Sequence, residues 1–109
     1  MCRRDEWDTA VARGTYEGSS QDRADGFIHF STAAQLPESA RKHRAGQPGL
    51  VLLAVDTDRV ANLLRWEPSR GGALFPHLYA PLDLSALLWA EPLELGADGV
   101  HRLPEGVAA

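Results

Sequence analysis

The sequence has little of what marks secreted, membrane-spanning or thiolate-cluster proteins. Its 109 residues include a single cysteine, Cys2, which excludes an internal disulfide and a metal site built from several thiolates. No apolar run approaches the ~20 residues that span a bilayer, and no signal-peptide pattern opens the chain. From these absences we expect a reduced, cytoplasmic setting and no membrane partner.

Charge of one sign is scarce as well. The formal net charge is −4 and like charges do not run together, so long-range attraction to nucleic acid or to an anionic membrane is not expected. Ten of the eleven basic residues are arginine, whose guanidinium suits phosphate and carboxylate better than lysine does. The length and a hydrophobic fraction of 44% are typical of one globular domain, which we expect to span 1–109.

Hydrophobic periodicity predicts both helices and strands. We expect a helix over 4–13 that ends at Gly14, and a second helix over about 36–45 behind a Thr32-x-x-Gln35 capping box. Between the first helix and the first strand, 15–25 is expected to be a polar loop with a short strand near its start. The strands are predicted at 27–30, 50–55, 64–67, 86–95 and 100–103.

The order of these elements is too irregular for a doubly wound parallel sheet. The predicted fold class is therefore α+β, a small domain with a curved, mostly antiparallel sheet and short helices. The uninterrupted apolar run at 50–55 predicts a central strand, buried on both faces. Asp56 is expected to cap a helical turn around 60–64, and 97–99 is a tight-turn signal between two arms of a hairpin.

The segment 66–82 carries chemistry that a fold does not require. Three prolines interrupt it, so we expect neither one helix nor one strand there, but an irregular segment around a Gly-Gly hinge. Loops with such polar and aromatic content are where sites are usually mounted. Its candidate site residues are Glu67, Ser69, Arg70, His77 and Tyr79.

A second polar stretch, 25–32, is predicted to be a strand that runs into a helix cap. Alternate residues of a strand share a face, so His29 and Ser31 are expected to point the same way. An imidazole beside a hydroxyl can bind ribose or phosphate, or act as an acid or base near neutral pH. We predict that the two stretches form opposite walls of one pocket, with a buried core histidine as the alternative for His29.

Each candidate in 66–82 has a structural alternative. Glu67, held before a proline, could stabilise a cationic transition state or bind a sugar hydroxyl, or it could be a surface acid paired with Arg65 or Arg70. Ser69, Arg70 and the free amides of the two glycines suit an anion, or form a flexible hairpin loop. For Tyr79, simple packing is the favoured alternative.

Other polar groups are predicted to have no chemical role. The basic cluster 41–44 is expected to be a solvated helix face, and His101 receives no assignment. A metal site would need His29, His77 and Glu67 to converge. Neither a helical histidine spacing nor a cysteine pair supports one, so no metal is expected.

Four segments together match a known pattern: 25–31, 53–55, 66–73 and 75–79. On these segments the chain resembles the bacterial domain of unknown function 952 family, and the match covers nearly the whole chain. That resemblance implies a single small α+β domain with an ADP-ribosylation-like fold. The family normally begins with a short strand, Ile-Tyr-His or Ile-Tyr-Lys, and this chain starts at or just after that point, so we expect either that the start is truncated or that the strand is missing.

A more distant likeness is to the C-terminal domain of tRNA 2′-phosphotransferases, which share the NAD-using fold. It is carried by the order His29-Phe30-Ser31, then a helix with Arg41, His43 and Gly46, then an apolar strand ending at Asp56. The RNA-binding domain of those enzymes has no counterpart here, and the acidic charge disfavours an RNA substrate.

These resemblances imply an ADP-ribosyltransferase-like domain that binds NAD, the candidate cofactor, or a related small-molecule nucleotide. An active domain would cleave the nicotinamide–ribose bond and pass ADP-ribose to a small acceptor or to water. In this interpretation Glu67 would stabilise the cation and Arg70 would hold a phosphate. His29 and Ser31 would hold ribose or carboxamide. His77 would be a second polar wall. The alternatives are a non-enzymatic module that binds a nucleotide or a peptide in the same cleft, and a subunit of a larger assembly.

Overall fold

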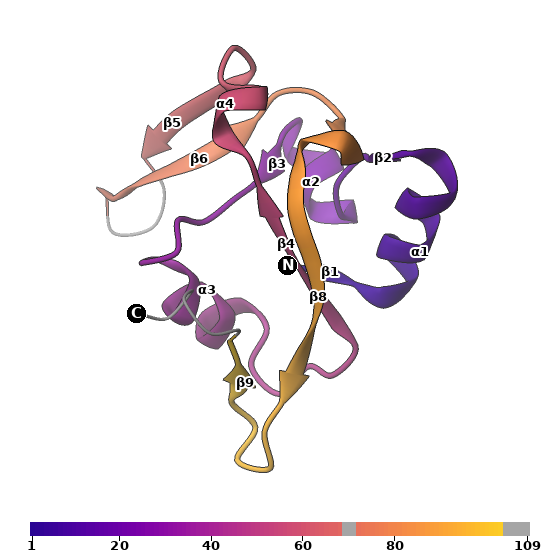
Figure 1. Ribbon diagram of the computed structural model, residues 1–109. Helices are drawn as coiled ribbons and strands as arrows, with labels where there is room; N and C mark the ends of the chain where they lie inside the picture. Colours follow the sequence, from indigo (N-terminus) through magenta and orange to yellow (C-terminus); the bar gives the residue numbers. More distant parts are fainter. Residues whose placement is uncertain (69–71, 104–109) are drawn as a thin grey trace.

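The computed structural model describes residues 1–68 and 72–103 (Figure 1). The described strands form three separate sheets, of four, two and three strands, rather than the one curved sheet that we expected. Every strand pairing is antiparallel, as predicted. The α+β class is confirmed, with few and short helices.

The four-stranded sheet has the order β1-β4-β8-β9. Its interior strand β4 (Leu50–Val55) lies between β1 (Cys2–Arg3) and β8 (Leu87–Leu95), which confirms the central position predicted for the apolar run. Burial on both faces holds only for the first half of β4, since its last three residues are partly exposed. β1 is a strand that we had not expected, and it pairs with β4 through Cys2 and Val51.

Beyond β8 the chain turns back as predicted. β9 (His101–Arg102) pairs with Glu94 and Leu95 of β8 across the turn at 97–99. Pro92 lies inside β8 opposite Val51, at a position where β9 does not reach. A proline is tolerated there because the strand has a neighbour on one side only in the described chain.

The three-stranded sheet corrects the prediction for 66–82. Its order is β3-β6-β5, formed by β3 (Ile28–His29), β6 (Leu74–Leu78) and β5 (Leu64–Pro68). A proline removes one N–H but keeps its carbonyl, and the Pro76 carbonyl accepts a hydrogen bond from the Phe30 amide at 2.9 Å. Proline therefore did not prevent a strand at 74–78, and the segment is largely two arms of a hairpin.

The helices agree with the sequence in part. α1 (Arg4–Arg13) has the predicted bounds, and Gly14 ends it with a positive φ of 81°. α2 (Ser20–Asp25) lies where we had predicted a loop. α3 (Leu36–His43) ends two residues early, and Thr32 and Gln35 exchange the predicted capping-box hydrogen bonds just before it. α4 (Thr57–Val60) follows the Asp56 cap, earlier than expected.

Three short elements complete the fold, and the hydrophobic core has two parts. β2 (Thr15–Tyr16) pairs with β7 (Leu82–Asp83), and a 3₁₀ turn, η2 (Leu84–Ala86), leads into β8. Figure 1 shows α1 and α2 on one side of the four-stranded sheet, and α3 with the β5–β6 hairpin on the other. No helix in the described chain is long and apolar enough to cross a membrane. The larger core cluster consists of Cys2, Ala10, Tyr16, Ile28, Val51, Val60, Leu78, Leu82 and Ala86, and the smaller of Leu36, Leu50, Leu52 and Leu93.

Candidate functional site

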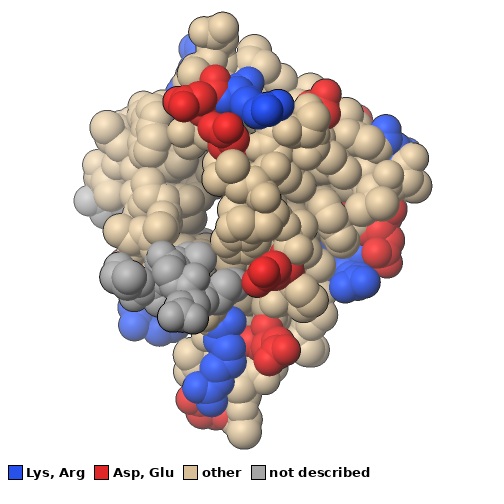
Figure 2. Space-filling model, in the orientation of Figure 1, with Lys and Arg blue, Asp and Glu red and all other residues tan. Residues whose placement is uncertain are grey.

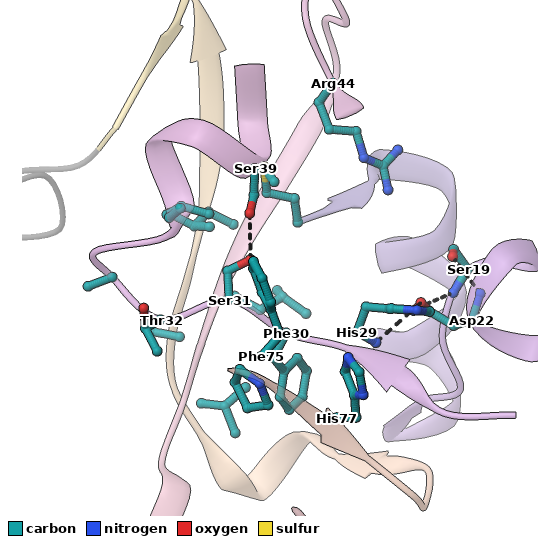
Figure 3. Close-up of a pocket in the computed structure, with 18 of the residues that line it drawn as sticks. Ser19, Asp22, His29, Phe30, Ser31, Thr32, Ser39, Arg44, Phe75 and His77 are labelled. Atoms are coloured by element: carbon teal, nitrogen blue, oxygen red, sulfur yellow. Dashed lines mark hydrogen bonds and ion pairs between the residues drawn. The ribbon is translucent and has the colours of Figure 1, made fainter. Parts of the chain in front are cut away.

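A cavity of about 820 Å³ lies among the three-stranded sheet, the four-stranded sheet and the segment around α3 (Figure 3). Its size falls within the range of about 300–1,000 Å³ that is usual for small-molecule sites. Figure 2 shows a face of the molecule that is hollowed near its centre, with acidic and basic groups interspersed around the periphery. The cavity is therefore large enough for a nucleotide-sized molecule.

One part of the cavity wall is aromatic. The rings come from three different elements and one loop, so the tertiary fold assembles this wall. Trp66 is 49% exposed, and such a half-exposed indole can stack against a flat ligand ring. The aromatic lining residues are Phe30, Trp66, Phe75 and Trp89.

Another part of the wall carries hydroxyl groups and an arginine. The Ser31 hydroxyl donates to the Ser39 hydroxyl at 3.0 Å, and Ser39 is buried on α3. Arg44, the residue that follows α3, donates from Nη1 to Gln47 Oε1 at 3.2 Å. Within the described ranges Arg44 has no carboxylate partner, so its charge is available to an anionic ligand. Thr32 lies beside these groups in the lining.

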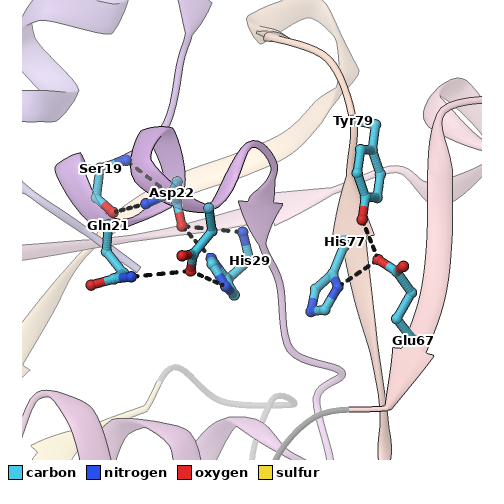
Figure 4. Close-up of polar contacts among 8 residues, drawn as sticks. Ser19, Gln21, Asp22, His29, Glu67, His77 and Tyr79 are labelled. Carbon is cyan, nitrogen blue, oxygen red and sulfur yellow. Dashed lines mark hydrogen bonds and ion pairs between the residues drawn. The ribbon is translucent and has the colours of Figure 1, made fainter.

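His29 enters the cavity wall held by two carboxylates from α2. Its Nδ1 lies 2.6 Å from Asp22 Oδ1, and its Nε2 lies 3.2 Å from Asp25 Oδ2 (Figure 4). Asp22 is only 8% exposed, and it also accepts hydrogen bonds from the backbone amides of Ser19 and His29. Gly18 makes room for this carboxylate, because a Cβ there would lie 2.7 Å from the Asp22 Cβ. The His29 ring is therefore oriented by a structure built around Asp22.

His77 is held by a third carboxylate, that of Glu67. The His77 Nδ1 lies 2.9 Å from Glu67 Oε1, and the Tyr79 hydroxyl donates to the same oxygen at 2.6 Å (Figure 4). The hydrogen bond from Tyr79, and then that from His77, lower the pKa of Glu67, so the group is a carboxylate at neutral pH. The hydrogen bond to Glu67 also raises the pKa of the Tyr79 hydroxyl.

The two histidines are neighbours because β3 and β6 pair. His29 lies opposite His77 in the register, and their ring centroids are 5.3 Å apart, edge to face. Phe27 packs against both rings and stacks on His77 at 4.2 Å. Strand pairing thus joins the two polar stretches of the sequence into one cluster of rings.

The predicted site residues fall into three groups. His29, Ser31 and His77 line the cavity. Glu67 and Tyr79 do not line it, but Glu67 contacts His77 and Tyr79 contacts Glu67. Ser69 and Arg70 lie outside the described residues. Of the two arginines considered as partners of Glu67, Arg65 lies over the Tyr79 ring, 5.2 Å from its centroid, and Arg70 lies outside the described residues.

Several polar lining residues were missed, among them Asp22, Ser39 and Arg44. Asp22 could have been found from Ser19-x-x-Asp22, which has capping-box spacing, and Ser39 shows no signal beyond its helical position. Arg44 belongs to the cluster that we predicted to be solvated. That prediction holds for Arg41 and Lys42, which are exposed and pair with Glu38, but Arg44 lines the cavity.

His101, which received no assignment, is 9% exposed, and its Nε2 donates to the Gln47 carbonyl at 2.8 Å. It ties β9 to the loop after α3. Over residues 1–68 and 72–103, no three or more His, Cys, Asp or Glu side chains are grouped so that they could hold a metal ion.

Fold and cavity together define a small α+β domain with a ligand-sized hollow between two antiparallel sheets. The chain belongs to the family described as "Protein of unknown function (DUF952)", whose model matches residues 1–90. No curated protein matches it.

Among solved structures, the chain is similar to protein CC0527 from Caulobacter crescentus. The crystal structure of CC0527 is 50% identical, with a TM-score of 0.92, over 99% of this chain and 95% of that one. A solution NMR structure of CC0527 is 52% identical, with a TM-score of 0.82, over 93% of this chain and 87% of that one. Both structures of CC0527 agree with the fold described above.

Proposed function

We propose that the cavity binds NAD or a related nucleotide, on a fold of the ADP-ribosylation type. One observation carries the proposal: a hollow of about 820 Å³ combines aromatic rings, hydroxyl groups and an arginine without a carboxylate partner in the described chain. A nucleotide offers a counterpart to each of these, namely a flat base, sugar hydroxyls and a phosphate. The distant likeness to tRNA 2′-phosphotransferases points to the same ligand class.

Each part of the ligand has a matching part of the wall. A base or nicotinamide ring stacks against Trp66 or the neighbouring aromatic rings. The ribose hydroxyls exchange hydrogen bonds with Ser31 and the other hydroxyl-bearing residues, and Arg44 takes a phosphate. Ser69 and Arg70 remain additional candidates for phosphate binding from the sequence.

Nucleotide binding is tested by isothermal titration calorimetry with NAD, ADP-ribose and AMP. A charge-assisted hydrogen bond contributes about 1.5–3 kcal/mol, so Arg44→Ala should weaken binding by about 10- to 100-fold. The matched control is Arg41→Ala, three residues earlier on α3, with a side chain that is 74% exposed and faces Glu38; it should bind like the wild type. Equal affinities for the two variants would contradict the placement of phosphate at Arg44.

A second candidate is cleavage of the nicotinamide–ribose bond. In that reaction the C–N bond breaks, nicotinamide leaves with the electron pair, and water or another acceptor adds to the ribose cation. The observation that favours it is a pair of carboxylates close to the cavity, that of Asp22 in the wall and that of Glu67 directly behind His77. A carboxylate near the cation is worth about 2–4 kcal/mol by analogy with other electrostatic catalysts.

Release of nicotinamide from NAD, measured by chromatography, separates the two candidates. An enzyme releases nicotinamide with time, and Glu67→Gln lowers the rate while the fold is retained. A non-enzymatic binding module shows a thermal shift with NAD but no product. The absence of both a shift and a product would reject the nucleotide class.

A further inference from the structure

A buried nitrogen of His77 has no hydrogen-bond partner. His77 is 5% exposed, and within the described chain its Nε2 is the one buried side-chain N or O atom left unpaired. Such atoms are rare in folded proteins because leaving one unpaired is costly. The partner of His77 Nε2 is therefore to be sought outside the described chain, and the residue lines the cavity.

With the ring neutral, the tautomer of His77 follows from its other nitrogen. Glu67 is ionised and has no proton to give, so it can only accept from His77 Nδ1. A neutral imidazole that carries its proton on Nδ1 has a lone pair on Nε2. The unpaired nitrogen is then an acceptor, and it calls for an O–H or N–H donor.

The tautomer is held by more than one contact. Tyr79 donates to the same Glu67 oxygen and fixes the carboxylate in place, and Phe27 stacks on the face of the His77 ring. Figure 4 shows the His77 ring reaching from β6 with its second nitrogen on the side away from Glu67, the side on which His29 lies. The His29 side chain is 38% exposed, and both of its carboxylate partners lie on α2.

We propose that His77 Nε2 accepts a hydrogen bond from an O–H or N–H group of the ligand, with Glu67 and Tyr79 as positioning residues that hold the accepting tautomer. This inference rests on the proposed nucleotide-binding function and narrows it. Sugar hydroxyls, base amino groups and carboxamides carry such donors, whereas a bare phosphate does not. Glu67 acts on the ligand through His77, because it does not line the cavity itself.

Two substitutions separate the nitrogens of His77. His77→Asn keeps a donor near the position of Nδ1 and loses the group at Nε2. His77→Gln keeps a polar group near Nε2 and loses the bond to Glu67. With NAD titrated calorimetrically, we expect about 10- to 100-fold weaker binding by His77→Asn and a loss of less than about threefold by His77→Gln.

The role of Glu67 is tested by NMR of the ¹⁵N-labelled protein without ligand. The ring nitrogens of wild-type His77 should show Nδ1 protonated and Nε2 bare. Glu67→Gln can offer an amide N–H to Nδ1, and it should shift the ring toward the Nε2–H tautomer and weaken NAD binding. No atom that lines the cavity is removed by this change.

The outcomes are distinct. If the wild type binds no nucleotide, the proposed function fails and the inference falls with it. If the wild type binds but His77→Gln is the weaker variant, nucleotide binding stands and His77 serves only to hold Glu67. An Nε2–H tautomer in the wild type overturns the inference directly, whatever the ligand.

Discussion

Asp22 is the carboxylate on which the α2 side of the cavity depends, and its removal is a sharp test of the structure. Its two oxygens accept from Ser19 N at 2.9 Å, from His29 N at 3.3 Å and from His29 Nδ1 at 2.6 Å. Asp22→Ala leaves these donors without an acceptor. Each buried orphan donor costs about 1–3 kcal/mol, and because water reaches part of this site we expect a total near the lower end, about 2–4 kcal/mol.

The matched control is Asp25→Ala. Asp25 lies on the same helix and also faces His29, at 3.2 Å, but its side chain is 36% exposed. An exposed ion pair contributes less than about 1 kcal/mol. Urea unfolding followed by circular dichroism gives the free energies of unfolding of both variants. In thermal unfolding of a domain of ~100 residues, the Asp22 variant should melt about 10–20 °C lower than the wild type.

A double-mutant cycle with His29→Ala isolates the contact between the two side chains. We expect a coupling free energy of about 1–3 kcal/mol between Asp22 and His29, since they share a charge-assisted hydrogen bond. If Asp22→Ala is no more destabilising than Asp25→Ala, the carboxylate does not organise this wall. Our account of how His29 is oriented would then be wrong.

Two further predictions concern Glu67 and Gly18. Tyr79→Phe removes the largest cause of the lowered Glu67 pKa, so that pKa should rise in an NMR titration of the side-chain carboxyl carbon. Because the pKa of Glu67 is lower in the folded state, its carboxylate stabilises the fold above the unfolded-state pKa. This stabilisation is lost as the pH falls through the folded-state pKa of Glu67. In Tyr79→Phe the stability lost in this pH range should be smaller. Gly18→Ala should cost more stability than Gly14→Ala in urea unfolding. Both glycines have a positive φ, at which any side chain costs about 1–2 kcal/mol. Only at Gly18 would the new Cβ also overlap Asp22. Equal losses of stability in the two variants would count against this close approach.

Local signals in the sequence were sufficient for several elements. α1 has an amphipathic pattern, acids in its first turn and a terminal glycine, and each of these acts within a few residues. β4 is a single apolar run, and its central position follows from that. The hairpin from β8 to β9 is set by a tight-turn sequence. Features of this kind are determined by neighbours in the chain, so a sequence displays them.

Other elements depend on contacts between distant residues. α2 is six residues long and polar, too short to be stable alone, and the His29 backbone amide bonds to its Asp22 carboxylate. β6 contains Pro76, which argued against a strand until the pairing with β3 and β5 was known. Arg44 lines the cavity from the position just after α3, which ends at His43 and not at 45.

The candidate site shows the same division. Residue types alone singled out His29, Ser31 and His77, and all three line the cavity. The sequence could not show that Glu67 lies behind His77, because that depends on the register of β5 against β6 and on a hydrogen bond across the hairpin. The carboxylate partner of His29 was missed for a similar reason, since Asp22 lies seven residues away on a helix that was not predicted.

The central claim is that the cavity holds a nucleotide, and a titration of the ¹⁵N-labelled protein with NAD, followed by two-dimensional NMR, tests it most directly. We predict saturable shifts of the resonances of Ser31, Arg44 and His77, with Lys42 unaffected because it is exposed and does not line the cavity. The absence of shifts at millimolar NAD, or shifts confined to residues that do not line the cavity, would contradict the account.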